Sequence, residues 1–168
     1  VTYRRFPSTT GIYDMEGKLV EIVSEVPLIE DLPKGFMAVR EGRRELSWRN
    51  DRPASLIYVS ALDKGDPENE VDHRDEIFQL EAPFSGEGKS IAKLINRFNT
   101  IRWGNEKLAI VSDYWWNTRN LKTYVIDPSD NSKKPKILFD RNYQDNYSDP
   151  GSFVMTRNEL GSEVMAIN

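Results

Sequence analysis

The sequence contains few residues that could carry covalent chemistry. His73 is the only histidine, and the chain has no cysteine. A serine-hydrolase triad needs a histidine to accept the proton of the nucleophile, and the serine commonly stands in a Gly-x-Ser-x-Gly elbow. That motif is missing, since the stretch Ser85–Gly88 lacks the first glycine. We therefore predict no catalytic residue, and the absence of cysteine excludes disulfides and zinc–thiolate sites.

Carboxylates are numerous but do not form a recognisable site. A glycosidase sets two carboxyl groups about 5 to 9.5 Å apart, and pairs such as Asp63 and Asp66 do not establish that distance. Asp140, Asp145 and Asp149 could gather a calcium ion, but their spacing is not that of an EF-hand. We interpret these segments as solvated loops and predict no metal and no cofactor.

Two adjacent tryptophans, Trp115 and Trp116, are the first candidates for binding. Neighbouring residues of a strand point to opposite faces of the sheet, so both rings cannot enter the same interface. Either one ring is left to stack on a ligand, a sugar or a neighbouring domain, or both are buried, one on each side.

Two arginines accompany these rings. Arg119 follows at the next turn, and Arg74 takes the matching place in an earlier repeat of the chain. Each guanidinium could pair with a carboxylate, for which Asp75 or Asp113 would serve. Alternatively, the arginines line a tunnel or face an acidic peptide. Arg74 and Arg119, with the two tryptophans, are the predicted substrate or domain contacts.

A repeat should position these residues. Two copies of four short β-type runs begin near Trp48 and Trp103, about 55 residues apart. A four-stranded unit at such a period is typical of a β-propeller blade. The predicted fold is all-β, with blades of four antiparallel strands and about two full blades plus a half-blade at each end.

We expect a half blade over residues 11–26, blades over 36–95 and 97–140, and a half blade over 151–168. The segment Phe36–Trp48 opens the first blade, in which we expect strands near Leu46–Trp48, Ser55–Leu62, Glu76–Leu80 and Ser90–Ile95. The N-terminal end supplies a third and a fourth strand, and the C-terminal end a first and a second. The two ends could therefore complete one blade, in one molecule or through self-association, because bare sheet edges invite pairing.

Composition fits a globular protein and argues against two classes of partner. The 168 residues are 38% hydrophobic and carry a net charge of −4, which gives no electrostatic reason to bind nucleic acid or an acidic membrane. No apolar run reaches membrane-spanning length. The chain begins with Val1 in β-like sequence, and we expect it to be a piece of a longer protein.

Several runs resemble the propeller of prolyl-oligopeptidase-type serine peptidases, in the branch that includes the glutamyl endopeptidases of chloroplasts and bacteria. The resemblance extends from about Gly11 to the end. The runs that carry it are Trp48–Tyr58, Leu62–Pro67, Arg74–Phe78, Ala82–Glu87 and Trp115–Arg119.

The resemblance implies a division of labour. In this family an N-terminal propeller caps a C-terminal α/β-hydrolase domain, which holds the catalytic Ser, Asp and His, and the propeller admits only peptides of limited size. No catalytic residue has a matching position here. The chain is then expected to gate and select peptide substrates and to be inactive alone. Bacterial members are often exported to the periplasm, which this sequence does not test. The alternative is a stand-alone binding module for sugars or proteins.

Overall fold

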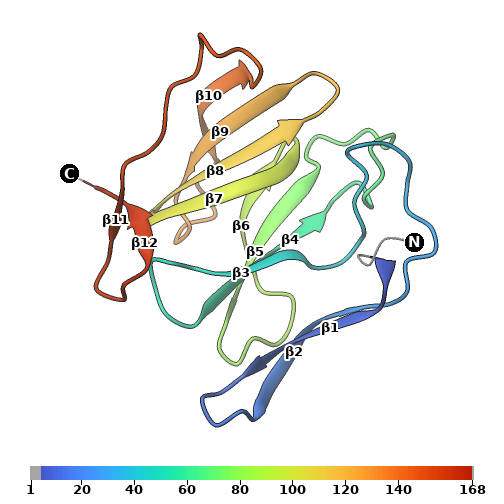
Figure 1. Cartoon of the computed structure of the whole chain (residues 1–168), viewed down its shortest axis with the longest axis vertical. Helices are drawn as coiled ribbons and strands as arrows, with labels where there is room; N and C mark the ends of the chain where they lie inside the picture. The colour runs from blue at the N-terminus through green and yellow to red at the C-terminus, as the bar shows by residue number, and fades with distance from the viewer. Residues whose placement is uncertain (1–4, 168) are drawn as a thin grey trace.

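The computed structural model describes residues 5–167, and these residues form an all-β structure of antiparallel sheets (Figure 1). Each strand pairs with the strand before or after it in the chain. The first sheet contains β3 (Arg44–Trp48), β4 (Ser55–Ala61), β5 (Asp75–Glu81) and β6 (Lys89–Leu94). The second contains β7 (Arg97–Asn105), β8 (Leu108–Trp115), β9 (Asn120–Ile126) and β10 (Lys136–Asn142).

The first sheet is covered on both faces. The run Ser55–Val59 is buried throughout, as expected for a strand without a solvent face. One face packs against the second sheet through Ile57, Val59 and Ile77. The other face packs Leu56 and its neighbours against β2. Successive side chains of a strand point to opposite faces, so one short run supplies two cores.

The second sheet packs face to face on the first. Trp103, Ala109, Val111 and Tyr124 share one hydrophobic cluster with the strands of the first sheet. Trp103 is only 3% exposed, and the guanidinium carbon of Arg49 lies 4.2 Å from its ring centroid. Removing this apolar area from water is the main stabilising contribution between the sheets.

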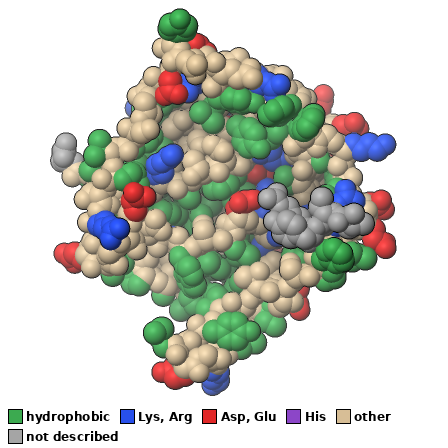
Figure 2. All heavy atoms as spheres, in the orientation of Figure 1, with side chains coloured by type: hydrophobic (Ala, Val, Ile, Leu, Met, Phe, Trp, Pro, Cys, Tyr) green, Lys and Arg blue, Asp and Glu red, His purple; other side chains and the backbone are tan. Residues whose placement is uncertain are grey.

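A short hairpin lies at each end of this stack. β1 (Ser8–Tyr13) and β2 (Leu19–Val26) cover the outer face of the first sheet, where Val23 is buried. β11 (Met155–Arg157) and β12 (Glu163–Met165) lie next to β7. Hydrophobic side chains remain at the surface around the β1–β2 hairpin (Figure 2). The most exposed of them are Tyr13, Met15, Leu19, Val20 and Ile22.

The all-β class and the four-stranded antiparallel sheets are confirmed. The predicted opening run Leu46–Trp48 lies in β3, and residues 36–43, which were placed in the same blade, form turns and loop. The half-blade and blade boundaries remain a prediction, as does pairing of the terminal hairpins, which form two separate sheets here. Among residues 5–167 no helix is long and apolar enough to span a membrane.

Candidate functional site

The four predicted contact residues assemble at one end of the two sheets. Trp115 ends β8, Trp116 and Arg119 belong to the turn before β9, and Arg74 immediately precedes β5. The guanidinium carbon of Arg74 lies 4.1 Å from the centroid of the Trp115 ring, and that of Arg119 lies 3.9 Å from Trp116. Each arginine therefore covers one tryptophan by a cation–π contact.

Arg74 and Trp115 are engaged within the protein. Arg74 donates from Nη1 to Oδ2 of Asp63 at 2.8 Å and to the carbonyl oxygen of Asn69 at 3.2 Å. Trp115 is half-buried. The expected partner of Arg74 is thus corrected, since Asp63 takes the role predicted for Asp75 or Asp113. This arginine is a weaker candidate for a ligand contact, because its Nη1 is already engaged by Asp63 and by the Asn69 carbonyl oxygen.

Asp63 belongs to a buried ion cluster that joins the two sheets. Arg97, the first residue of β7, donates to both carboxylate oxygens of Asp63 at 2.8 and 2.7 Å and to Oδ1 of Asp75 at 3.1 Å. Arg44 donates to the same oxygen of Asp75 at 2.7 Å. The buried ion cluster, defined as Arg44, Asp63, Arg74, Asp75 and Arg97, thus links β3 and the flanks of β5 to β7.

Sequence reasoning missed this cluster. The acidic stretch 63–75 was interpreted as a solvated loop, yet Asp63 is 1% exposed and Asp75 is 0% exposed. Charged side chains are almost never fully buried unless they are paired. One signal was present: both aspartates adjoin runs that were predicted as strands, and Arg97 begins the next predicted sheet. The three residues are far apart in sequence, so only the fold brings them together.

A second buried carboxylate, Asp113, holds the connection between the sheets. It accepts from the backbone N–H of Asn96 at 2.9 Å, the Asn96 amide at 3.0 Å and the Tyr124 hydroxyl at 2.8 Å. Burial is the largest influence on Asp113 and raises its pKa above the usual 3.8. Burial also raises the pKa of Tyr124, and the neighbouring Asp113 charge adds to that shift. These contacts fix a turn and leave the carboxylate no open face for substrate.

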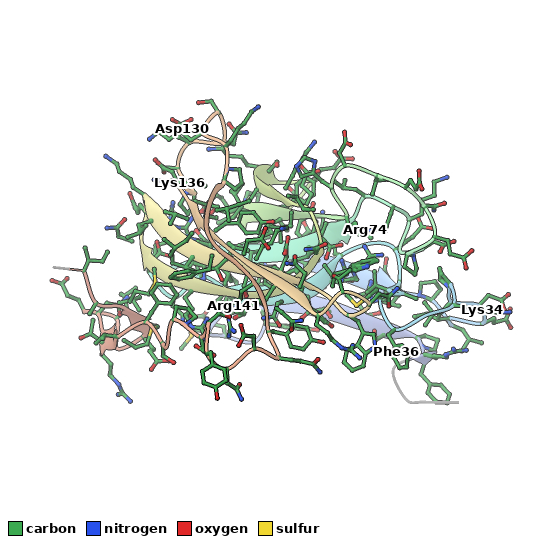
Figure 3. All side chains as sticks on the ribbon, turned by 90° about the horizontal axis from the view of Figure 1, so that it is seen from above. Lys34, Phe36, Arg74, Asp130, Lys136 and Arg141 are labelled. Carbon is green, nitrogen blue, oxygen red and sulfur yellow. The ribbon has the colours of Figure 1, made fainter. Side chains whose placement is uncertain are left out.

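The surface at this end is formed by Phe36, Trp116 and Arg119, which we call the aromatic–arginine patch. Phe36 is 82% exposed and Trp116 is 38% exposed. Their ring centroids are 5.3 Å apart, with the planes tilted by 36°. Figure 3 shows Phe36 and Arg74 on the same end of the molecule. Phe36 was not predicted as a contact residue, because it stands in the segment that was expected to open the first blade.

The tryptophan alternatives are now distinguishable. Trp116, which lies just beyond β8, keeps part of its surface in solvent, whereas Trp115 is half-buried under Arg74. Neither of the two alternatives holds for both rings: Trp115 is half-buried and Trp116 is partly exposed. Of the two rings, Trp116 therefore has the larger exposed surface for a ligand.

No metal centre is apparent in the described part of the chain, where no three His, Asp or Glu side chains are grouped suitably. The aspartates considered as calcium ligands take different partners. Asp140 accepts from Lys122 at 2.5 Å, and Asp149 accepts from Arg141 at 2.7 Å. The hydrogen bond from Lys122 is the largest influence lowering the pKa of Asp140.

A separate cleft of about 620 Å³ opens between the outer strands of the two sheets. Its lining is mixed, with apolar residues such as Ile91 and Ile137 beside Glu76 and Lys134. His73 is also on its wall, but no serine elbow accompanies it. Ser90 lines the same cleft, and its hydroxyl donates to Oε1 of Glu76 at 2.5 Å rather than to His73.

Comparison with known proteins gives two curated relatives, each named "Probable glutamyl endopeptidase, chloroplastic". The protein of Oryza sativa subsp. japonica is 39% identical over 164 residues, which are 96% of this chain and 18% of the rice protein. The protein of Arabidopsis thaliana is 38% identical over 164 residues, which are 96% of this chain and 17% of that protein. The chain is related to part of these peptidases. It spans less than one fifth of their length.

No protein-family model and no solved structure matches the chain. The relationship to the named peptidases therefore depends on sequence identity across almost the whole of this chain. The structure contributes the arrangement of sheets and the surfaces that they present.

Proposed function

We propose that this chain is a non-catalytic propeller segment of a prolyl-oligopeptidase-type serine peptidase and that it gates and selects peptide substrates for a hydrolase domain. The observation that carries the proposal is the 38–39% identity to proteins named glutamyl endopeptidase over 96% of the chain. The absence of a Gly-x-Ser-x-Gly motif from the sequence supports a non-catalytic role.

The architecture supports the same role. Two four-stranded antiparallel sheets pack face to face, the β1–β2 hairpin covers the outer face of the first sheet, and the β11–β12 hairpin lies next to β7. Stacked sheets of this kind are the units of a propeller. A propeller that covers an active site can exclude bulk water and large substrates, and hydrolysis of a peptide benefits from a site closed to water.

The first test is the reading frame. We expect the gene to continue past the codon for Asn168 into a segment that contains Gly-x-Ser-x-Gly. A stop codon soon after Asn168 would contradict the proposal.

The second test measures gating in the complete protein. Trp103→Ala removes a buried ring between the two sheets, and we expect the loosened propeller to gain cleavage of a folded protein substrate relative to a short glutamyl peptide. Tyr147→Ala is the matched control, because Tyr147 is fully exposed. Equal size discrimination in wild type and both variants would show that these sheets do not gate.

The alternative function, a stand-alone module that binds sugars, is less well supported. A sugar ring stacks on an open aromatic face, but the Trp116 ring already contacts Arg119 and Phe36. The distinguishing measurement is tryptophan fluorescence of this chain against a panel of glycans.

A further inference from the structure

We propose that the aromatic–arginine patch binds a peptide carboxylate that lies beside an apolar side chain. Arg119 would receive the carboxylate, and Phe36 with the open part of Trp116 would receive the apolar group. The proposal concerns a binding site of this chain and does not rest on the proposed function, since it requires neither a hydrolase domain nor turnover.

Arg119 is held in a costly backbone conformation. Its φ is +58°, a left-handed value that glycine adopts readily and most other residues avoid. The turn is closed by its N–H, which donates to the carbonyl oxygen of Trp116 at 3.2 Å. Glycine would satisfy this turn with less strain, so the turn itself does not explain an arginine. Four other non-glycine residues of the described chain also have a positive φ, so the role proposed for Arg119 depends on its side chain.

The side chain of Arg119 is positioned but not neutralised. Its Nη1 donates to the Trp116 carbonyl oxygen at 2.7 Å, and the guanidinium carbon lies 3.9 Å from the centroid of the Trp116 ring. In the part of the chain that the structure describes, no carboxylate lies within ion-pair distance of Arg119, in contrast with Arg44, Arg74 and Arg97. A planar guanidinium with remaining donors is suited to a carboxylate.

Phe36 is exposed because its neighbours hold it there. Met37, the next residue, is 3% exposed, and its sulfur accepts from the N–H of Trp116 at 3.4 Å. The carbonyl oxygen of Met37 accepts from Nε of Arg97 at 2.9 Å. The buried residue therefore anchors the loop, and the exposed ring beside it is held against Trp116. An anchored aromatic ring loses little conformational freedom when a partner covers it.

The surrounding charge limits the class of ligand. Gly35 adjoins Pro67, which places the loop that carries Asp66 and Glu68 on the Phe36 side of the patch. These carboxylates disfavour a uniformly acidic ligand there. The patch fits an extended peptide that offers one carboxylate to Arg119 and an adjacent apolar residue to Phe36.

The test uses the 168-residue chain and two blocked tripeptides, acetyl-Leu-Glu-Leu-amide and its neutral glutamine counterpart, with binding followed by tryptophan fluorescence. We expect the glutamine peptide to bind at least about tenfold more weakly, because a hydrogen bond to a charged group is lost. Equal affinity for the two peptides would overturn the proposal, as would the absence of binding at millimolar peptide.

Variants separate binding from folding. Arg119→Gly relieves the positive φ, so we expect an unchanged or higher melting temperature together with at least about tenfold weaker binding of the glutamate peptide. Arg52→Gln is the control, since Arg52 is a half-buried arginine of the β3–β4 connection that pairs with Glu81. The affinity of this variant should equal that of wild type. Wild-type affinity in Arg119→Gly would refute the site.

Phe36→Ser tests the apolar half of the site. It should weaken binding of the leucine-flanked peptide but not of acetyl-Gly-Glu-Gly-amide, which has no apolar side chain. If Phe36→Ser binds both peptides as wild type does, the assignment of Phe36 is wrong. If oligosaccharides change the fluorescence and the glutamate peptide does not, the patch is a sugar site instead.

Discussion

The buried ion cluster makes a prediction that depends on its charge balance. It contains three arginines and two aspartates. Arg97→Met leaves one arginine for each carboxylate, because Arg74 still pairs with Asp63 and Arg44 with Asp75. Asp63→Asn instead leaves three guanidinium groups around one carboxylate. The second change should therefore destabilise the fold more than the first.

The magnitudes follow from the burial of the cluster. Removing one partner of a buried ion pair costs about 3–5 kcal/mol. We expect about 3 kcal/mol for Arg97→Met, where the remaining charges are matched, and about 5 kcal/mol for Asp63→Asn, where they are not. Total stabilities of domains are about 5–15 kcal/mol, so the aspartate variant is expected to lie close to unfolding.

Urea denaturation followed by circular dichroism measures both changes. With a slope of about 3 kcal/mol per molar urea, the midpoints should fall by about 1 M and about 1.7 M. The control is Arg52→Met, which removes a surface pair with Glu81 at 3.5 Å and should cost less than about 1 kcal/mol. The charge-balance argument fails if Arg97→Met is the more damaging variant, or if both match the control.

Two further predictions concern the connections between strands. Because burial raises the pKa of Asp113 above 3.8, the folded state holds its proton more tightly than the unfolded state, and stability should fall as pH rises from about 3.8 through the raised pKa. Asp113→Asn should lack that decline in urea melts across this range, and a pH-independent difference from wild type would contradict the assignment. Gly65→Ala would place a Cβ 2.0 Å from the Val39 carbonyl oxygen at a φ of +76°, so its melting temperature should drop clearly, whereas Gly17→Ala, with nothing nearby but a similar φ, should show only the backbone strain.

The strands were largely predictable because their signal is local. The apolar runs around Ile57 and Val111 lie in β4 and β8, and the turns between them contain glycine, proline and aspartate as expected. The two repeats nevertheless use equivalent residues differently. Trp103 is 3% exposed between the sheets, whereas Trp48 is 48% exposed and contacts Phe84 edge-on. A repeat predicts that a strand exists, but not which neighbour covers it.

The candidate site was only partly predictable because its contacts join distant segments. Trp116 and Arg119 are close in sequence, and their association was foreseeable. Phe36 reaches them only because Met37 is anchored by Arg97, 60 residues further along the chain. Likewise, the expected carboxylate partners of the arginines were wrong for Arg74, which binds Asp63. Such pairings depend on how loops meet above two packed sheets, which a pattern within one strand does not encode.

Pairing of every strand with its neighbour in the sequence has a consequence for synthesis. Once Leu94 has left the ribosome, all four strands of the first sheet are available, together with the hairpin that covers one face. The nascent chain can thus bury apolar surface step by step, since N-terminal segments fold first during translation. Until β7 to β9 emerge, the other face of that sheet stays bare, and this interval is when a chaperone would be needed most.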